Sequence, residues 1–214
     1  MLKNGGFEKD DSALLPKSWM LQKEWTEILQ KADPSYGKFI HLAAVNFADM
    51  KLEQAEEMCK KALAIAEGPA VFYILSQISR LKGNIKDYGI FAEKVRVFLP
   101  EDISVARMAF TALLESENYE LIVSNYKRLS PEVKCDGRVT MLYGFALLRL
   151  GEIENAEEAM NQNGGITVSD IQEGEISLTQ LYIQIEEAKA KRDNLPFDAK
   201  NVAVPKRFDF RMFV

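Results

Sequence analysis

The chain has 214 residues, 47% of them hydrophobic, and a formal net charge of −5 at pH 7. This length and apolar content favour one elongated domain with a continuous core. The negative charge argues against general affinity for nucleic acid, and no apolar run reaches the length of a membrane span. The N-terminus also lacks the apolar centre of an export signal, so we expect a cytoplasmic protein.

The N-terminal region begins with a polar, glycine-containing stretch, and residues 1–17 are expected to form an extended or disordered leader. Ser18 can cap a helix that runs to about Lys31, and Asp33-Pro34 would end it. Apolar residues, among them Trp25, share one face of this helix. We expect it to cover the repeated elements that follow, as an N-terminal capping helix.

Helical periodicity continues through the middle of the chain, where apolar residues recur at a helical spacing. Phe39, Leu42 and Ala43 form one such stripe, and Ala55 and Ala62 belong to the next. Short polar turns join these stripes in pairs, which predicts helical hairpins. The predicted helices cover residues 37–49 with 52–66, 69–82 with 85–98, 103–116 with 118–129, and 137–150 with 153–161.

The hairpins repeat with a period of roughly 33 to 34 residues. One position of the first helices holds Leu42, Leu75, Ala109 and Tyr143, and the turns hold Met50, Gly83, Glu117 and Gly151. Together with the small Ala55, the Ala62-Leu63 pair and the helix-ending Pro100, this pattern resembles the tetratricopeptide repeat (TPR) family over about residues 36–161. The resemblance implies an all-α fold. About four TPR-like hairpins would stack over residues 18–161 into a right-handed superhelix, an α-solenoid with N- and C-terminal capping helices and an irregular C-terminal tail.

Two hairpins depart from the family pattern. Where the second helix usually carries alanine, the second repeat has Tyr88 and the third has Ile122. Because these side chains are larger, we expect both hairpins to open slightly. The fourth repeat runs into the turn-forming residues 161–165, which should end its second helix early.

Residues 162–214 are predicted to form a capping helix and a packed tail. Residues 166–170 suit an extended segment, and Ser177 with Gln180 forms a capping-box pattern that predicts a helix over about 177–192. The tail over 196–214 is expected to be irregular yet packed, because it contains Phe197, Val204, Phe208, Phe210, Met212 and Phe213. It would lie in the groove of its own chain, on a neighbouring domain or on a second copy.

A second resemblance involves residues 170–178 (DIQEGEISL), Pro205 and residues 208–212 (FDFRM). These segments are similar to the C-terminal region of large bacterial TPR proteins. In those proteins a β-sandwich region resembling mutarotase-type carbohydrate domains precedes the repeats. The similarity covers about residues 137–212 and implies a link to carbohydrate processing, with this chain as the helical part of a larger protein.

In the TPR family the first helices of the hairpins line a concave groove. The resemblance implies that the partner-binding groove is lined by His41, Phe47, Tyr73, Gln77, Arg80, Arg107, Thr111, Arg138, Met141 and Arg149. Arginines on this face would suit the carboxylates of an acidic protein or peptide, because guanidinium binds them bidentately. Alternatively, these arginines are solvated or pair with Glu101, Glu115 and Glu117.

The sequence contains no motif typical of catalysis or cofactor binding. His41 has no Cys, Asp or second His at ligand spacing, and Cys59 and Cys135 lack the spacing of a metal site. Cys59 falls on a buried stripe, which favours a free, packed thiol. The Gly164-Gly165 pair lacks the longer pattern of a phosphate loop. We therefore expect no enzyme activity, no catalytic or metal site and no cofactor.

Three functions are left open by these observations. The leading hypothesis is a protein–protein or domain–domain interaction scaffold that uses the TPR groove. The alternative is a helical scaffold or dimerisation module at the C-terminal end of a larger carbohydrate-active enzyme, with the N-terminal domain of that enzyme as its partner. A third is a homo-oligomer in which copies of the chain exchange the tail and the capping helix.

Overall fold

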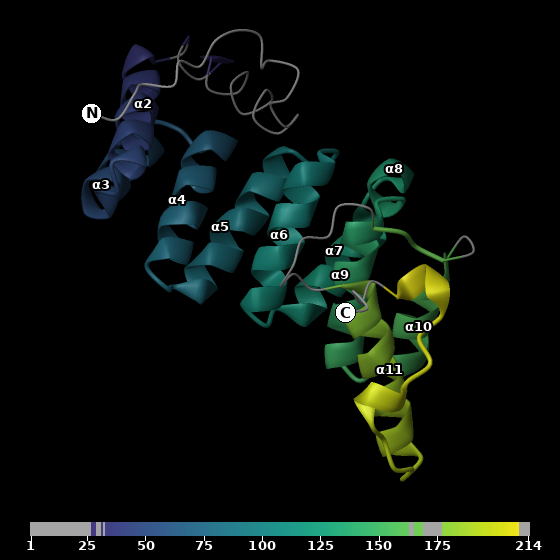
Figure 1. Cartoon of the computed structure of the whole chain (residues 1–214). Coiled ribbons are helices and arrows are strands. Elements are labelled where there is room, and N and C mark those ends of the chain that lie inside the picture. Colours follow the sequence, from purple (N-terminus) through teal and green to yellow (C-terminus); the bar gives the residue numbers. More distant parts are fainter. Residues whose placement is uncertain (1–26, 29–30, 32, 163–164, 169–176, 210–214) are drawn as a thin grey trace, which may run out of the picture.

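The protein is an array of α-helices packed in consecutive pairs (Figure 1). The structure is a computed structural model that describes residues 27–28, 31, 33–162, 165–168 and 177–209. Within these residues all regular structure is helical, and no β-strand occurs. The helices are α2 (Pro34–Ala48), α3 (Leu52–Leu63), α4 (Pro69–Leu81), α5 (Ile85–Phe98), α6 (Ile103–Glu115), α7 (Tyr119–Arg128), α8 (Pro131–Lys134), α9 (Gly137–Arg149), α10 (Ile153–Asn161) and α11 (Leu178–Arg192), with 3-10 helices at η3 (Ala199–Asn201) and η4 (Lys206–Phe208).

The predicted helical pairs are confirmed. α2 packs on α3, α4 on α5, α6 on α7 and α9 on α10, and each pair also contacts the next pair along the chain. The one-turn helix α8, which Ser130 caps, was not predicted. The predicted leader lies outside the described residues. Of the predicted N-terminal helix only Glu27, Ile28 and Lys31 are described, and these three are helical.

The first helices of the pairs begin at polar caps that the sequence contains. The carboxylates of Asp33, Asp102 and Asp136 each accept a hydrogen bond from a backbone N–H in the first turn of α2, α6 and α9. α4 begins at Pro69 instead, where the N–H that proline lacks would have no partner within the helix. Each of these helices therefore starts at a residue with a local reason to start it.

All four hairpins turn through the same motif. The N–H of Met50 donates to the carbonyl of Phe47, and the N–H of Lys51 donates to that of Asn46. This pair of bonds recurs at the other three turns and is a Schellman motif, which needs a residue in the left-handed region. That residue is Met50 (φ 59°), Gly83 (φ 71°), Glu117 (φ 59°) or Gly151 (φ 80°). The predicted turn positions are thus confirmed.

α11 ends in the way that the first helix of a hairpin ends. Asn194 has a φ of 53°, and the N–H groups of Asn194 and Leu195 donate to Lys191 and Ala190 in the pattern of the four turns. Within the described residues no α-helix follows, and residues 195–209 are irregular apart from η3 and η4. The predicted capping helix is confirmed, and it corresponds to a first helix without a second.

The apolar core forms two large clusters joined by a seam of small residues. One cluster is built from α2 to α5 with Val105 of α6, and the other from α6 to α11 with Phe208. Between them, Ala92 of α5 packs with Ala109 and Ala112 of α6. Gly89 belongs to the same seam, because a Cβ there would overlap the Ser116 side chain.

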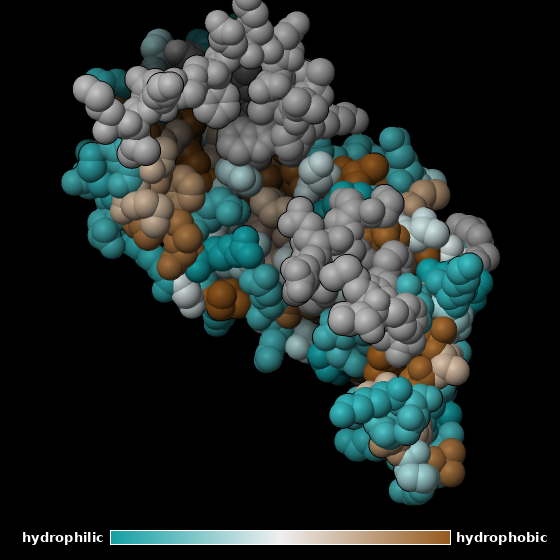
Figure 2. Space-filling view, in the orientation of Figure 1, coloured by the Kyte–Doolittle hydropathy of each residue, from teal (hydrophilic) through white to brown (hydrophobic). Residues whose placement is uncertain are grey.

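The residues of one predicted repeat position differ in burial. Leu75 and Ala109 are buried and Tyr143 is partly buried, but Leu42 is 36% exposed. Leu42 is therefore less enclosed than the residues at the same position of the other three hairpins. α2 is the first helix of the first described pair, so no described hairpin precedes it to cover this face, and apolar colour is visible at the α2–α3 end in Figure 2.

The expected opening of two hairpins is confirmed for one of them. α6 and α7 approach each other over a much shorter length than α2 and α3 do, which fits the larger Ile122. α4 and α5 pack as closely as α2 and α3, so the expectation was wrong for Tyr88. The ring of Tyr88 lies instead among the alanines of the seam, between α5 and α6.

The C-terminal tail is irregular and packed, as predicted, up to Asp209. Phe208 is 1% exposed, and its carbonyl accepts a hydrogen bond from Thr179 Oγ1 of α11. Arg207 Nη2 donates to Asn161 Oδ1 at the end of α10, at 2.6 Å. The tail thus closes the last described hairpin, whereas the predicted contacts of Phe210, Met212 and Phe213 lie outside the described residues.

No helix in the described part of the chain combines the length and the apolar composition that crossing a bilayer requires.

Candidate functional site

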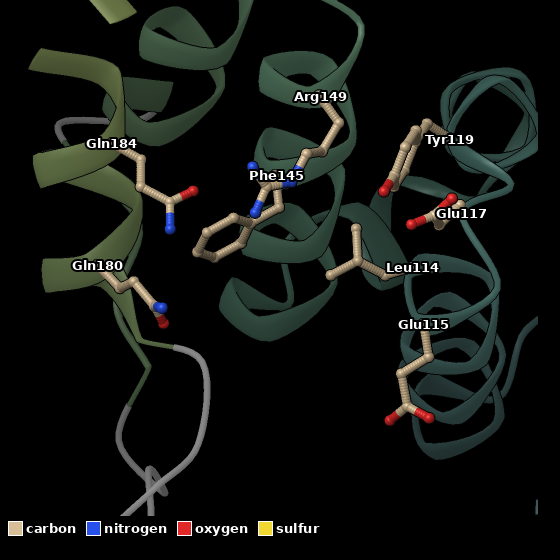
Figure 3. A pocket seen from close by; sticks show the side chains of 8 residues that line it. All are labelled: Leu114, Glu115, Glu117, Tyr119, Phe145, Arg149, Gln180 and Gln184. Atoms are coloured by element: carbon tan, nitrogen blue, oxygen red, sulfur yellow. The ribbon is translucent and has the colours of Figure 1, made fainter. Parts of the chain in front are cut away.

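Three helices and one turn surround a hollow of about 210 Å³, which we call the α9 hollow. Figure 3 shows α11 on one side, α9 in the middle, and α6 with the start of α7 on the other side. The hollow is lined by Leu114, Glu115, Glu117, Tyr119, Phe145, Arg149, Gln180 and Gln184. The residues that line it therefore come from three first helices, α6, α9 and α11, from the α6–α7 turn and from the first residue of α7.

The hairpin motif places the acidic side of the hollow. Glu115 is the last residue of α6, and Glu117 is the left-handed residue of the turn that follows, where two of the other hairpins have glycine. Tyr119 is the first residue of α7. Tyr119 and Glu117 are neighbours in Figure 3, whereas Glu115 points away from them past Leu114.

Several polar groups of the hollow have no partner in the described protein. Glu115, Glu117 and Arg149 form no hydrogen bond or ion pair with another described residue. Gln184 Oε1 is buried and lacks a hydrogen-bond donor among the described residues. Glu115, Glu117 and Arg149 are exposed, so their charged groups are available to a ligand that supplies complementary polar atoms.

The hollow continues beyond Arg149 and Gln184. Both residues also line a neighbouring depression of about 360 Å³, together with Leu148, Glu187, Ala188 and Lys191. The two spaces follow α9 and α11 and together suit an extended ligand better than a compact one. None of the residues that line either space comes from the described part of the tail.

The predicted groove residues are spread along the array. His41 is exposed on α2, Gln77 and Thr111 are partly exposed on α4 and α6, and Arg149 lines the α9 hollow. Phe47 and Tyr73 pack against the α2–α5 cluster, and this burial raises the pKa of Tyr73. The structure thus brings one of the ten predicted residues, Arg149, to the hollow.

Three of the predicted arginines contact other parts of the protein or are partly buried. Arg107 makes a bidentate ion pair with Asp136, with Nε–Oδ1 at 3.0 Å and Nη2–Oδ2 at 2.6 Å. Because Asp136 also caps α9, Arg107 ties α6 to α9. The guanidinium of Arg80 lies 5.7 Å from the centroid of the Tyr88 ring, and Arg138 of α9 is partly buried.

Met141 is corrected, because it is 2% exposed and belongs to the α6–α11 cluster. A side chain that is enclosed in this way is inaccessible to a partner. Helical spacing placed it on the face of α9 next to Arg138, and only the packing of the neighbouring helices closes that face.

The acidic and amide residues of the hollow were not predicted as a site. Glu115 and Glu117 were considered only as internal partners of the arginines and Gln180 only as part of the capping box, and Gln184 was not singled out. One sequence signal was available, because Glu117 stands at a turn position that is glycine in two other repeats. Its exposure beside α9 and α11 depends on the packing between hairpins.

Searches of protein-family models, of curated proteins and of solved structures found no match to the chain. The TPR resemblance and the resemblance to large carbohydrate-related proteins accordingly stay predictions. Within the described ranges no three His, Cys, Asp or Glu side chains come together in a way that would hold a metal ion.

Proposed function

We propose that this protein is a helical-repeat interaction module whose hairpins stack in the manner of TPR proteins. Its first helices bind a segment of a partner protein on their shared face, the concave side of the proposed right-handed superhelix. The observation that carries this proposal is the α9 hollow, where side chains from α6, α9 and α11 converge with unpaired polar groups.

The extended arrangement of the two spaces supports a protein segment as the partner. The hollow measures about 210 Å³ and adjoins a depression of about 360 Å³ that follows the same two helices. A space of this size suits one side chain of a larger partner. The adjoining depression along α9 and α11 would then take the neighbouring part of the same segment.

The rigidity of the surroundings also supports a binding role. α9 is held to α6 by the Arg107–Asp136 pair and packs on α10 and α11. A surface that is already ordered before binding loses little conformational entropy on binding, which raises affinity.

A displayed library of random dodecapeptides tests this proposal. Peptides selected on the full chain should bind the Arg149→Ala/Gln184→Ala variant at least about tenfold more weakly, which corresponds to about 1.4 kcal/mol. Arg128→Ala is the matched control, because Arg128 is exposed on α7 and does not line the hollow. Selected peptides that bind the double variant as tightly as the wild type would refute the proposed site.

The alternative role, a scaffold within a larger carbohydrate-active enzyme, rests on the resemblance of residues 170–178 and 208–212. Most of these residues lie outside the described part of the chain. No contact or cavity among the described residues favours that role over peptide binding.

A further inference from the structure

The lining of the α9 hollow carries a net negative charge, because it has two carboxylates, Glu115 and Glu117, and one guanidinium, Arg149. Glu115 and Glu117 contribute two carboxylates, and neither is paired with a cation among the described residues. α6 ends at Glu115, so the partial negative charge at the C-terminal end of this helix adds to the same region. A cationic group is therefore favoured at this end of the hollow.

Apolar groups next to the carboxylates suit a long cationic side chain in particular. Leu114 and the Tyr119 ring stand beside Glu117 in Figure 3, and the Phe145 ring lies deeper in the hollow. Lysine and arginine pack their aliphatic stems on apolar surface while the charged end reaches polar groups. Aromatic rings additionally attract such cations through their faces.

The other side of the hollow offers hydrogen-bond groups for a peptide backbone. Gln180 and Gln184 project from α11 towards α9, and Gln184 Oε1 is the buried acceptor without a donor. The exposed side-chain amide of Gln180 can exchange hydrogen bonds with the backbone of a bound segment. Arg149, at the end of α9, stands between the two spaces and separates the acidic end from the depression beyond it.

We propose that the α9 hollow recognises a lysine or arginine side chain of a peptide segment, with Glu115 and Glu117 as the residues that select the positive charge. This inference rests on the proposed function and names its partner chemistry. It departs from the acidic partner expected from the arginines, because Arg107 is already paired with Asp136. The partner segment is therefore basic at the position that enters the hollow.

Pools of dodecapeptides with one defined residue test this inference. Four pools carry Lys, Arg, Glu or Gln at a central position and random residues elsewhere, with acetylated and amidated ends that remove terminal charges. Retention on the immobilised full chain is measured at low and high salt. The Lys and Arg pools should be retained about tenfold better than the Glu pool, because the carboxylates attract cations and repel anions. This preference should shrink in high salt.

Charge reversal provides the decisive comparison. The Glu115→Lys/Glu117→Lys variant should prefer the Glu pool. The control variant Glu132→Lys/Glu158→Lys changes the net charge equally at two exposed carboxylates outside the hollow, and it should keep the wild-type preference. Equal retention of the Gln and Lys pools, or an unchanged preference in the Glu115/Glu117 variant, overturns the inference and leaves peptide binding intact. Retention of no pool overturns both proposals.

Discussion

The chain has two cysteines, and the thiol of one is buried whereas that of the other is exposed. Cys59 lies fully buried between the helices of the first hairpin, and burial raises its pKa from 9.0 to about 12. Cys135 is exposed after α8. Tyr36 lies in the same cluster as Cys59, and burial likewise raises its pKa to about 12. The first hairpin therefore contains two acids that are favoured in their neutral forms.

These raised pKa values predict a loss of stability in alkaline solution. The contribution of neutral Cys59 is fully present below pH 9.0 and is lost as the pH rises towards about 12, because the unfolded chain ionises first. Urea midpoints measured at pH 8, 9.5 and 10.5 should fall. In Cys59→Ala the fall should be shallower, and in Cys135→Ala it should match the wild type. If the urea midpoint falls with pH equally in the wild type and both variants, Cys59 does not cause the loss of stability.

The hairpin turn has the same backbone conformation in every repeat. The same Schellman bonds close all four hairpins and end α11, although the left-handed residue is glycine at only two of these five sites. Left-handed backbone costs a non-glycine residue roughly 1–2 kcal/mol. Met50 and Glu117 therefore impose a local cost that the packing of their hairpins offsets. For Glu117, the proposed binding of a positively charged side chain gives a functional reason for this cost.

Substitutions at the turns should shift stability in opposite directions. Met50→Gly removes the left-handed penalty at an exposed residue and should raise the free energy of unfolding by up to about 1 kcal/mol. Gly83→Ala introduces the penalty, with no steric contact to obscure it, and should lower stability by about 1 kcal/mol. Chemical denaturation measures both. A stabilising Gly83→Ala would show that the turn does not have the described conformation.

The molecule as a whole is two core clusters coupled through the seam between α5 and α6. At Gly89 the helices approach so closely that an added Cβ would overlap Ser116 Oγ and lie 3.4 Å from the carbonyl oxygen of Ala112. Ser116 is held in turn by hydrogen bonds to Leu113 and Asn118. Cooperative unfolding of the two halves therefore depends on the packing between α5 and α6, in which Gly89 is the point of closest approach.

Enlarging Gly89 should weaken the coupling of the two halves. Gly89→Ala is expected to destabilise the protein by about 1–3 kcal/mol, as overpacking does. Hydrogen exchange should then show the α2–α5 amides opening more often than those of α9 to α11. The double variant Gly89→Ala/Ser116→Ala should recover part of the loss, and Ser116→Ala alone controls for the lost hydroxyl. Uniform opening of both halves would contradict two clusters joined at the seam.

Helix positions and turn residues were predictable from the sequence, because apolar periodicity, caps and Schellman turns are local properties. Ser177 marks a helix start wherever the hairpins lie in space, and Gly83 and Gly151 mark the turns in the same way. Asp33 was predicted only to end the preceding helix, although it also caps α2. The contacts between hairpins were decided only by the tertiary structure, because they join residues that are far apart in sequence. These contacts placed Tyr88 in the seam, enclosed Met141, paired Arg107 with Asp136, and brought Glu117 to face α9 and α11.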